Sequence, residues 1–387
     1  MIKLGVSLYP EQETLEDIDS YLKMASKYGF EKVFTSMFSV LGTKEEIIKY
    51  FSDFCEIAHK YNMVVSGDCN AEFFNRIDAT ESDLTVFKEM GIDIIRMDFS
   101  YNDKRDAILI NNSEGILIEM STGFKDVILN AIKNGANKKK ISTCHNFYPQ
   151  RYTAPDLTVI SEINDYWKSQ DVSVAFFITS QEKGTHGPWP VSDGLCTIED
   201  HRNLPIEVQL KHALSLKNID EILIGNAYAS EEEFKAIYKV MKEAYVNIPL
   251  KKELDFLVDY IPCGNITRIP FKINLAKDIS NLEKEILFNY PTHADLGDCL
   301  NYMLRSRWTR FLYKNESIPE RKTDKSVFTR GDVLVVNDNL KHYAGEIQIV
   351  LKDMIVDNQR NFLGRICEDE IMILNHIKAN DVFTFIE

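Results

Sequence analysis

Two aspartates stand at the ends of consecutive apolar segments and could act together on one substrate. Asp68 ends the segment 62–68, and Asp98 ends the segment 92–98. If these segments are adjacent parallel strands, which lie about 4.8 Å apart, both carboxyl groups face one cavity. Two carboxyl groups in one cavity can hydrolyse a glycosidic bond, with one of them as the proton donor. Each aspartate could instead cap the helix that follows it.

An arginine close to this pair could divide the roles of the two carboxyl groups. Arg96 precedes Asp98 by two residues, so in a strand both side chains point the same way, with Arg96 one layer deeper. A guanidinium there would lower the pKa of Asp98 and keep it ionised. Asp68 has Ser66 and Val64 beneath it instead. The sequence thus indicates one anion and one more easily protonated acid, as in glycosidases.

Other segments also end in side chains that could bind a substrate. They are Glu11, His145, Asn146, Tyr148 and Asn226. His145, on the next apolar segment after that of Asp98, could be a metal ligand in a metal-dependent hydrolase or isomerase. The sequence has no HxH or HExxH motif and no second clustered histidine to support this. We therefore expect His145 to form hydrogen bonds, and we expect neither a metal nor a cofactor.

The loop after the segment 173–179 has the residues of a site for an anion and a sugar. It carries Lys183, His186, Gly187 and Trp189, while Arg151 and Arg202 lie in nearby loops. Glycine lets backbone N–H groups approach an anion, and tryptophan offers a flat apolar face to a sugar ring. The cations indicate a phosphate or carboxylate site, although Arg202 could be an ordinary surface cation. An alternative phosphate site would use Arg305, Arg307 and Arg330.

Strand-like and helix-like segments alternate over the first 250 residues. The short apolar segments are 2–8, 32–37, 62–68, 92–98, 140–146, 173–179 and 221–226. The amphipathic segments are 14–28, 43–61, 81–90, 124–134, 206–217 and 230–245. This alternation favours an α/β fold with a parallel sheet, and a weaker eighth strand at 248–254 would complete a (β/α)8 TIM barrel. A doubly wound sheet is the alternative, but it usually has a glycine-rich loop where this chain reads SLYPE.

The pattern changes near residue 258. Five β-rich segments follow, IPFKINL, DVLVVND, GEIQIVLKDM, NFLGRIC and DVFTFIE, with one expected helix at 295–312. We therefore expect a catalytic barrel over 1–257 and a small, mostly β domain over 258–387.

Composition narrows the function classes further. The 387 residues include 45 Lys and Arg against 59 Asp and Glu, which gives a formal net charge of −14 and argues against nucleic-acid or anionic-membrane binding. Seven cysteines lie far apart, which suits reduced thiols. The start of the chain has no signal-peptide pattern, and no apolar stretch is long enough to span a bilayer. We expect a cytoplasmic protein, with a homodimer left open.

Five strings in this chain resemble the bacterial 6-phospho-N-acetylmuramidase family. They are GVSLYPE, CHNFYPQRYT, GPWPVSDGLCTIEDHRNLP, IGNAYASEEE and RGDVLVVNDNLKHYAGEIQIVLKDM. The resemblance covers essentially the whole chain in order. It implies a TIM barrel followed by a cyclophilin-like β domain.

The resemblance also implies a reaction, the hydrolysis of the β-1,4 bond between N-acetylmuramic acid 6-phosphate and N-acetylglucosamine in peptidoglycan recycling. Asp68 and Asp98 would serve the glycosidic bond, the cations the phosphate and lactate, and the aromatic side chains the sugar rings. A lyase acting on the lactyl ether of the same sugar phosphate and a non-catalytic sugar-phosphate sensor are the alternatives. Retention, inversion and attack by the substrate's acetamido oxygen all stay open.

Overall fold

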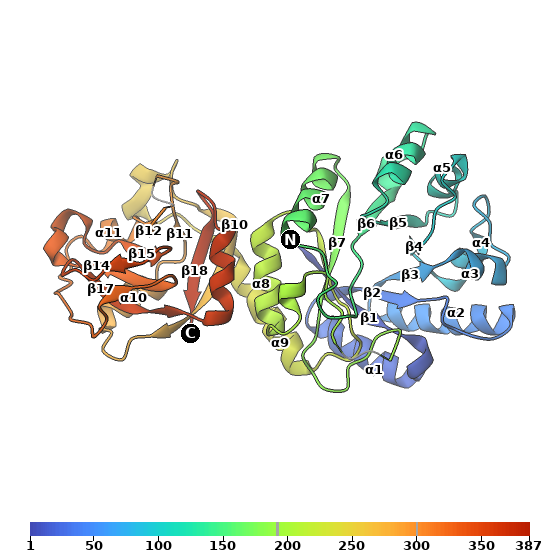
Figure 1. Cartoon of the computed structure of the whole chain (residues 1–387), viewed down its shortest axis with the longest axis horizontal. Helices are drawn as coiled ribbons and strands as arrows, with labels where there is room; N and C mark the ends of the chain where they lie inside the picture. Colours follow the sequence, from blue (N-terminus) through green and yellow to red (C-terminus); the bar gives the residue numbers. More distant parts are fainter. Residues whose placement is uncertain (191–192, 299–300) are drawn as a thin grey trace. The chain divides into compact units, whose positions relative to one another are not determined.

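The computed structural model describes residues 1–190, 193–298 and 301–387 (Figure 1). The chain forms two compact units, one of residues 1–210 with 216–238, the other of residues 211–215 with 239–387. The second unit includes residues before 258, the point where the sequence pattern changes. The reason is a strand that precedes residue 258 and pairs with the sheet of this unit. This strand is β9 (Tyr245–Ile248), which pairs antiparallel with β10 (Gly264–Leu275).

The first unit is a closed barrel of eight parallel strands in chain order, which confirms the predicted fold class. The strands are β1 (Lys3–Leu8), β2 (Phe30–Ser36), β3 (Val64–Cys69), β4 (Ile94–Met97), β5 (Leu117–Ser121), β6 (Ile141–Cys144), β7 (Ser173–Ile178) and β8 (Glu221–Ile224). In such a barrel, side chains at the carboxyl ends of the strands and in the following loops form the active site.

One barrel strand differs from the sequence prediction. The missing strand is β5, not 248–254: Ile248 ends β9, and residues 252–254 begin the 3₁₀ helix Lys252–Leu257. Strand β5 was hidden because Glu119 interrupts its short apolar run. Inside the barrel, Glu119 accepts a hydrogen bond from Lys32 Nζ at 2.7 Å. Since β5 lies between β4 and β6, the strands of Asp98 and His145 are not neighbours.

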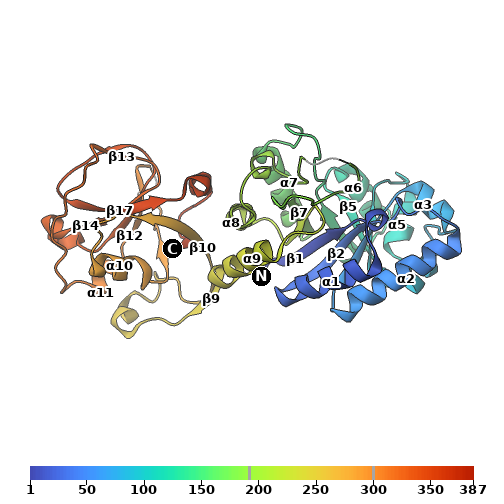
Figure 2. The same cartoon turned by 90° about the horizontal axis from the view of Figure 1, so that it is seen from below.

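Helices cover the outside of the barrel. They are α1 (Leu15–Lys27), α2 (Lys44–Lys60), α3 (Ala71–Arg76), α4 (Thr85–Met90), α5 (Lys104–Ile110), α6 (Lys125–Lys133), α7 (Leu157–Ser169), α8 (Ile206–Leu216) and α9 (Glu231–Ala244). Helix α2 begins with a capping box, in which Thr43 and Glu46 each bond the other's backbone N–H. Its apolar face buries Ile47 and Phe51, and it lies beside α1 (Figure 2).

The second unit is mostly β, as predicted. Its main sheet has the order β11-β18-β10-β17-β14-β15-β12, and β13 pairs with β16 separately. The remaining elements are α10 (Asn281–Phe288), β11 (His293–Ala294), β12 (Met303–Ser306), α11 (Thr309–Leu312), β13 (Val327–Phe328), β14 (Asp332–Val336), β15 (Ile347–Val350), β16 (Met354–Ile355), β17 (Arg360–Ile366) and β18 (Val382–Ile386).

The prediction of one helix over 295–312 is wrong for the described residues of that range. Strand β12 and the single turn α11 occupy its second half, whereas residues 299 and 300 lie outside the described part. Leu304 and Ser306 are buried while their neighbours are more exposed, which is the period of a strand. The apolar residues suit either period locally, and antiparallel pairing with β15 selects the strand.

Among the helices that the described residues form, none has both the length and the apolar character needed to cross a membrane.

Candidate active site

A cavity of about 200 Å³ opens at the carboxyl ends of the barrel strands. Six residues predicted from the sequence line it: Asp68, Arg96, Asp98, Asn146, Tyr148 and Trp189. The prediction that the two aspartates face one cavity therefore agrees with the structure. Four phenylalanines that the sequence analysis did not assign to the site complete the lining: Phe34, Phe38, Phe147 and Phe177.

Arg96 binds Asp68 rather than Asp98, which corrects the prediction. Its Nη1 donates to Asp68 Oδ1 at 2.7 Å, and its Nη2 donates to Asn146 Oδ1 at 2.5 Å. The cause is the strand register, because Arg96 and Asp68 are direct partners in β4 and β3. Asp98 lies one residue beyond β4 and is exposed.

The two aspartates have different surroundings. Burial raises the pKa of the Asp68 carboxyl above its usual value, the neighbouring Arg96 opposes this shift, and the charge of Asp98 adds to it. The backbone N–H of Asp98 donates to Cys69 O at 3.0 Å. A buried acid and an exposed carboxyl group thus share the cavity.

Aromatic rings form another part of the cavity wall. Phe177 on β7 makes edge contacts with Phe34 on β2 and Phe147, at centroid distances of 5.5 and 5.1 Å. Trp189 contacts Phe147 at 6.2 Å and remains 47% exposed. Such a wall suits the apolar face of a sugar ring. Phe34 and Phe177 could have been found from the two-residue period of their strands, which places them inside the barrel mouth.

His145 does not line this cavity. Thr122 Oγ1 lies 3.1 Å from Nδ1 of its ring, and Asn164 Oδ1 lies 2.6 Å from Nε2. Both ring nitrogens therefore have partners behind the barrel wall, and the structure does not bring His145 to the aspartates. In the described parts of the chain, no three His, Cys, Asp or Glu side chains are grouped as a metal site.

His145 should make the protein less stable in mild acid. Burial lowers the pKa of His145 to about 4, from an ordinary value of 6.5. Between these values the unfolded chain binds a proton that the folded protein does not bind, so the free energy of unfolding decreases as the pH decreases. From pH 7 to pH 5, we expect His145 to lower the free energy of unfolding by about 2 kcal/mol, as measured by urea denaturation. His145→Gln should remove this part of the pH dependence, whereas replacing the exposed His59 by Gln should leave it; an unchanged dependence in His145→Gln would contradict the assignment.

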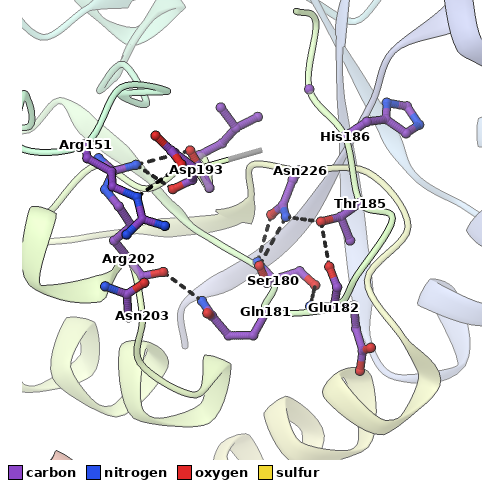
Figure 3. Close-up of a pocket in the computed structure, with 13 residues that line it drawn as sticks. Arg151, Ser180, Gln181, Glu182, Thr185, His186, Asp193, Arg202, Asn203 and Asn226 are labelled. Carbon is purple, nitrogen blue, oxygen red and sulfur yellow. Dashed lines mark hydrogen bonds and ion pairs between the residues drawn. The ribbon is translucent and has the colours of Figure 1, made fainter. Parts of the chain in front are cut away.

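A second cavity, of about 170 Å³, lies among the loops that follow β6, β7 and β8 (Figure 3). Five predicted residues line it: Arg151, His186, Gly187, Arg202 and Asn226. Lys183 is exposed and lines neither of these two cavities. The side chain of Glu11 lies outside the described part of the structure.

The two arginines of this cavity differ in how firmly they are held. Arg202 is buried and holds both Glu199 oxygens, at 2.6 and 2.7 Å, while its Nη1 donates to Asp193 O at 2.9 Å. This pairing lowers the pKa of Glu199 to about 2. Arg151 is half exposed, and its Nε donates to Asp193 Oδ1 at 3.1 Å (Figure 3). Arg202 thus supports the loops, and Arg151 is the cation better placed to meet a ligand.

Asn226 organises the backbone on the other side of the same cavity. Its Oδ1 accepts from Ser180 N at 2.8 Å, and its Nδ2 donates to Thr185 Oγ1 at 2.7 Å (Figure 3). Glu233 on α9 accepts from Gln181 N at 2.8 Å. Asn226 therefore shapes the loop, as a strand-end asparagine can.

Sequence analysis missed one buried acid beside this loop. The Glu13 side chain is fully buried, accepts from Tyr9 N at 3.1 Å and lies 3.4 Å from His186 Nε2. Burial raises the pKa of Glu13 to about 8. The imidazole of His186 points away from the arginines toward this acid, so it is not aimed into the second cavity (Figure 3). An acidic residue shortly after the first strand was the available signal.

Known proteins similar to this chain agree with the two-unit structure. A family model described as "6-phospho-N-acetylmuramidase, N-terminal" matches residues 4–239, and its C-terminal counterpart matches residues 269–386. An uncharacterized B. cereus protein of known crystal structure is 33% identical, with a TM-score of 0.85 over 100% of both chains. A conserved Enterococcus faecalis protein of unknown function is 24% identical, with a TM-score of 0.69 over 99% of this chain and 96% of its own. At this identity, the similarity shows a shared fold alone. No curated protein matches the chain in sequence.

Proposed function

Because this chain belongs to the 6-phospho-N-acetylmuramidase family, we propose that it hydrolyses the β-1,4 bond between N-acetylmuramic acid 6-phosphate and N-acetylglucosamine. The observation that carries the proposal is the pair of carboxyl groups, Asp68 and Asp98, in one cavity with aromatic walls. The pair fits the two roles that glycoside hydrolysis requires, and the aromatic rings fit the sugar.

In the proposed mechanism, Asp68 protonates the leaving O4 of N-acetylglucosamine as the bond from C1 to that oxygen breaks. Burial favours a protonated Asp68, and Arg96 stabilises the carboxylate that forms when the proton leaves. Asp98 then takes a proton from the water whose oxygen bonds to C1. Direct attack by Asp98, or by the substrate's acetamido oxygen, would reach the same products through an intermediate.

The phosphate is proposed to bind in the second cavity. Arg151 would contact it, together with backbone N–H groups near Gly187, while Arg202 holds the surrounding loops. Arg151 has to leave Asp193, which costs little because the pair is exposed. We place the reaction in the cytoplasmic recycling of peptidoglycan, where a phosphorylated disaccharide of this kind would arise.

The products of the purified protein acting on the phosphorylated disaccharide test the function. Hydrolysis releases N-acetylglucosamine. Release of lactate instead would identify a lactyl-ether lyase, and binding without any product would identify a sensor; either result would contradict the proposal.

A further inference from the structure

The two cavities of the barrel share one short segment, residues 186–189, in the loop that follows β7. Gly187 lines the second cavity, and Trp189, two residues later, lines the cavity of the aspartates. The position of this segment therefore affects both cavities at once. Neither the family description nor the reaction proposed above says what fixes it. We refer to residues 186–189 as the shared segment.

Two neighbouring residues after β1 hold the shared segment from one side. Gln12 Nε2 donates to Gly187 O at 3.1 Å. Glu13 Oε1 lies 3.4 Å from His186 Nε2, and it also accepts from Tyr9 N at 3.1 Å. The Glu13 carboxyl group thus links the end of β1 to the loop after β7.

The loop after β8 holds the shared segment from another side. Ala227 N donates to His186 O at 2.8 Å, and these two residues form an isolated β-bridge. Ala227 itself is fully buried. The exchange of its N–H with solvent therefore reports whether the shared segment is in place.

The surroundings of Glu13 favour a protonated carboxyl group. Its side chain is fully buried, and its Oε2 has no hydrogen-bond partner among the described residues. A charged carboxylate would be costly there. Burial raises the pKa of Glu13 to about 8; the hydrogen bond from Tyr9 N opposes this shift, and the charge of Asp17 adds to it. The titratable groups that face Glu13 come from the end of β1, from α1 and α2, and from the loops after β7 and β8; they are Tyr9, Asp17, Tyr21, Tyr50, His186 and Tyr228.

We propose that Glu13 is a positioning residue, which acts through His186 to hold the shared segment so that the phosphate and the sugar ring of one ligand bind at a fixed spacing. This rests on the function proposed above, which puts the phosphate near Gly187 and the sugar against the aromatic wall that includes Trp189. If the segment moves, the two subsites no longer fit one ligand, and part of the binding energy of the phosphate is lost. Because the Glu13 side chain is buried, it acts without touching the ligand.

Amide hydrogen exchange of Ala227, measured by NMR on the full chain, tests the hold. When the segment opens, Glu13 reaches water, where its pKa returns to about 4.5. Between pH 6.5 and pH 8, the held state binds a proton that the open state does not bind, so opening becomes more favourable as the pH increases. His186, whose pKa burial lowers from 6.5, titrates mainly below this range. We therefore expect the protection factor of Ala227 to decrease about tenfold from pH 6.5 to pH 8.

Two variants of Glu13 separate its proton from its shape. Glu13→Gln keeps the polar contacts but does not titrate, so Ala227 should stay protected without this pH dependence. Glu13→Ala should lower the protection at every pH. Glu16→Gln, which alters an exposed glutamate on α1, is the matched control and should behave as the wild type. Unchanged protection in Glu13→Ala, or a pH dependence that persists in Glu13→Gln, would overturn the proposal.

Binding of N-acetylmuramic acid 6-phosphate, measured by calorimetry, tests the positioning role. Arg151→Ala should weaken this binding about tenfold or more in the wild type, and clearly less when Glu13 is also replaced by alanine. Glu16→Ala should leave the effect of Arg151→Ala unchanged. A merely structural role of Glu13 would give additive effects, and that result would overturn the proposal, as would a wild type that does not bind the sugar phosphate. Binding with the predicted coupling, but without hydrolysis of the disaccharide, would contradict the proposed function alone.

Discussion

Replacing Asp68 or Asp98 by asparagine should lower turnover of the phosphorylated disaccharide by at least about a hundredfold, because each variant loses a positioned proton-transfer group. Asparagine keeps the shape of either side chain, and at position 68 it can still accept a hydrogen bond from Arg96, so the fold should persist. Asp68→Asn should also remove the alkaline limb of the pH–rate profile or shift it, since Asp68 must be protonated to act as the acid. Release of N-acetylglucosamine over time, measured across pH, gives both results.

The matched control for these variants is Asp53→Asn. Asp53 lies on α2, where it pairs with Lys49 at the surface. This variant should keep normal turnover. If Asp68→Asn or Asp98→Asn retained near-normal turnover while folded by circular dichroism, that aspartate would have no catalytic role.

Arg151→Ala should reduce catalytic efficiency on the phosphorylated disaccharide by about ten- to a hundredfold. Loss of one charged hydrogen bond to the phosphate costs about 1.5–3 kcal/mol. The effect should appear mainly in KM, because the phosphate lies away from the bond that breaks. The unphosphorylated disaccharide should be handled equally by both proteins.

Comparison of two substrates with two proteins isolates this coupling. Arg105→Ala, which removes a surface arginine paired with Asp103, should show no preference between the substrates. Equal losses of Arg151→Ala on both substrates would mean that Arg151 supports the loop or the sugar ring, and the phosphate site would lie elsewhere.

The barrel was predictable from the sequence because most of its strands are short apolar runs between amphipathic helices. β5 was the exception, since the charge of Glu119 is compensated by Lys32, which is distant in the sequence. The prediction of a helix over 295–312 failed for a related reason. Its apolar spacing suits a helix, and only pairing with β15 reveals a strand.

The candidate site was predictable where a residue's position in a strand decides its direction. For this reason the sequence could place three side chains at one cavity, those of Asp68, Arg96 and Asp98. Which aspartate holds the arginine depends on the register between β3 and β4, which spacing within one strand does not determine. Likewise, His145 directly follows β6, but its ring bonds with Thr122 and Asn164 and does not line the cavity.

Hydrolysis of the phosphorylated disaccharide in ¹⁸O-labelled water tests the central claim most directly. The account predicts one ¹⁸O at C1 of N-acetylmuramic acid 6-phosphate and none in N-acetylglucosamine, because water supplies the oxygen that replaces the glycosidic bond. N-acetylmuramic acid 6-phosphate incubated alone in the same water corrects for exchange. Release of lactate, label in N-acetylglucosamine, or no cleavage at all would contradict the account.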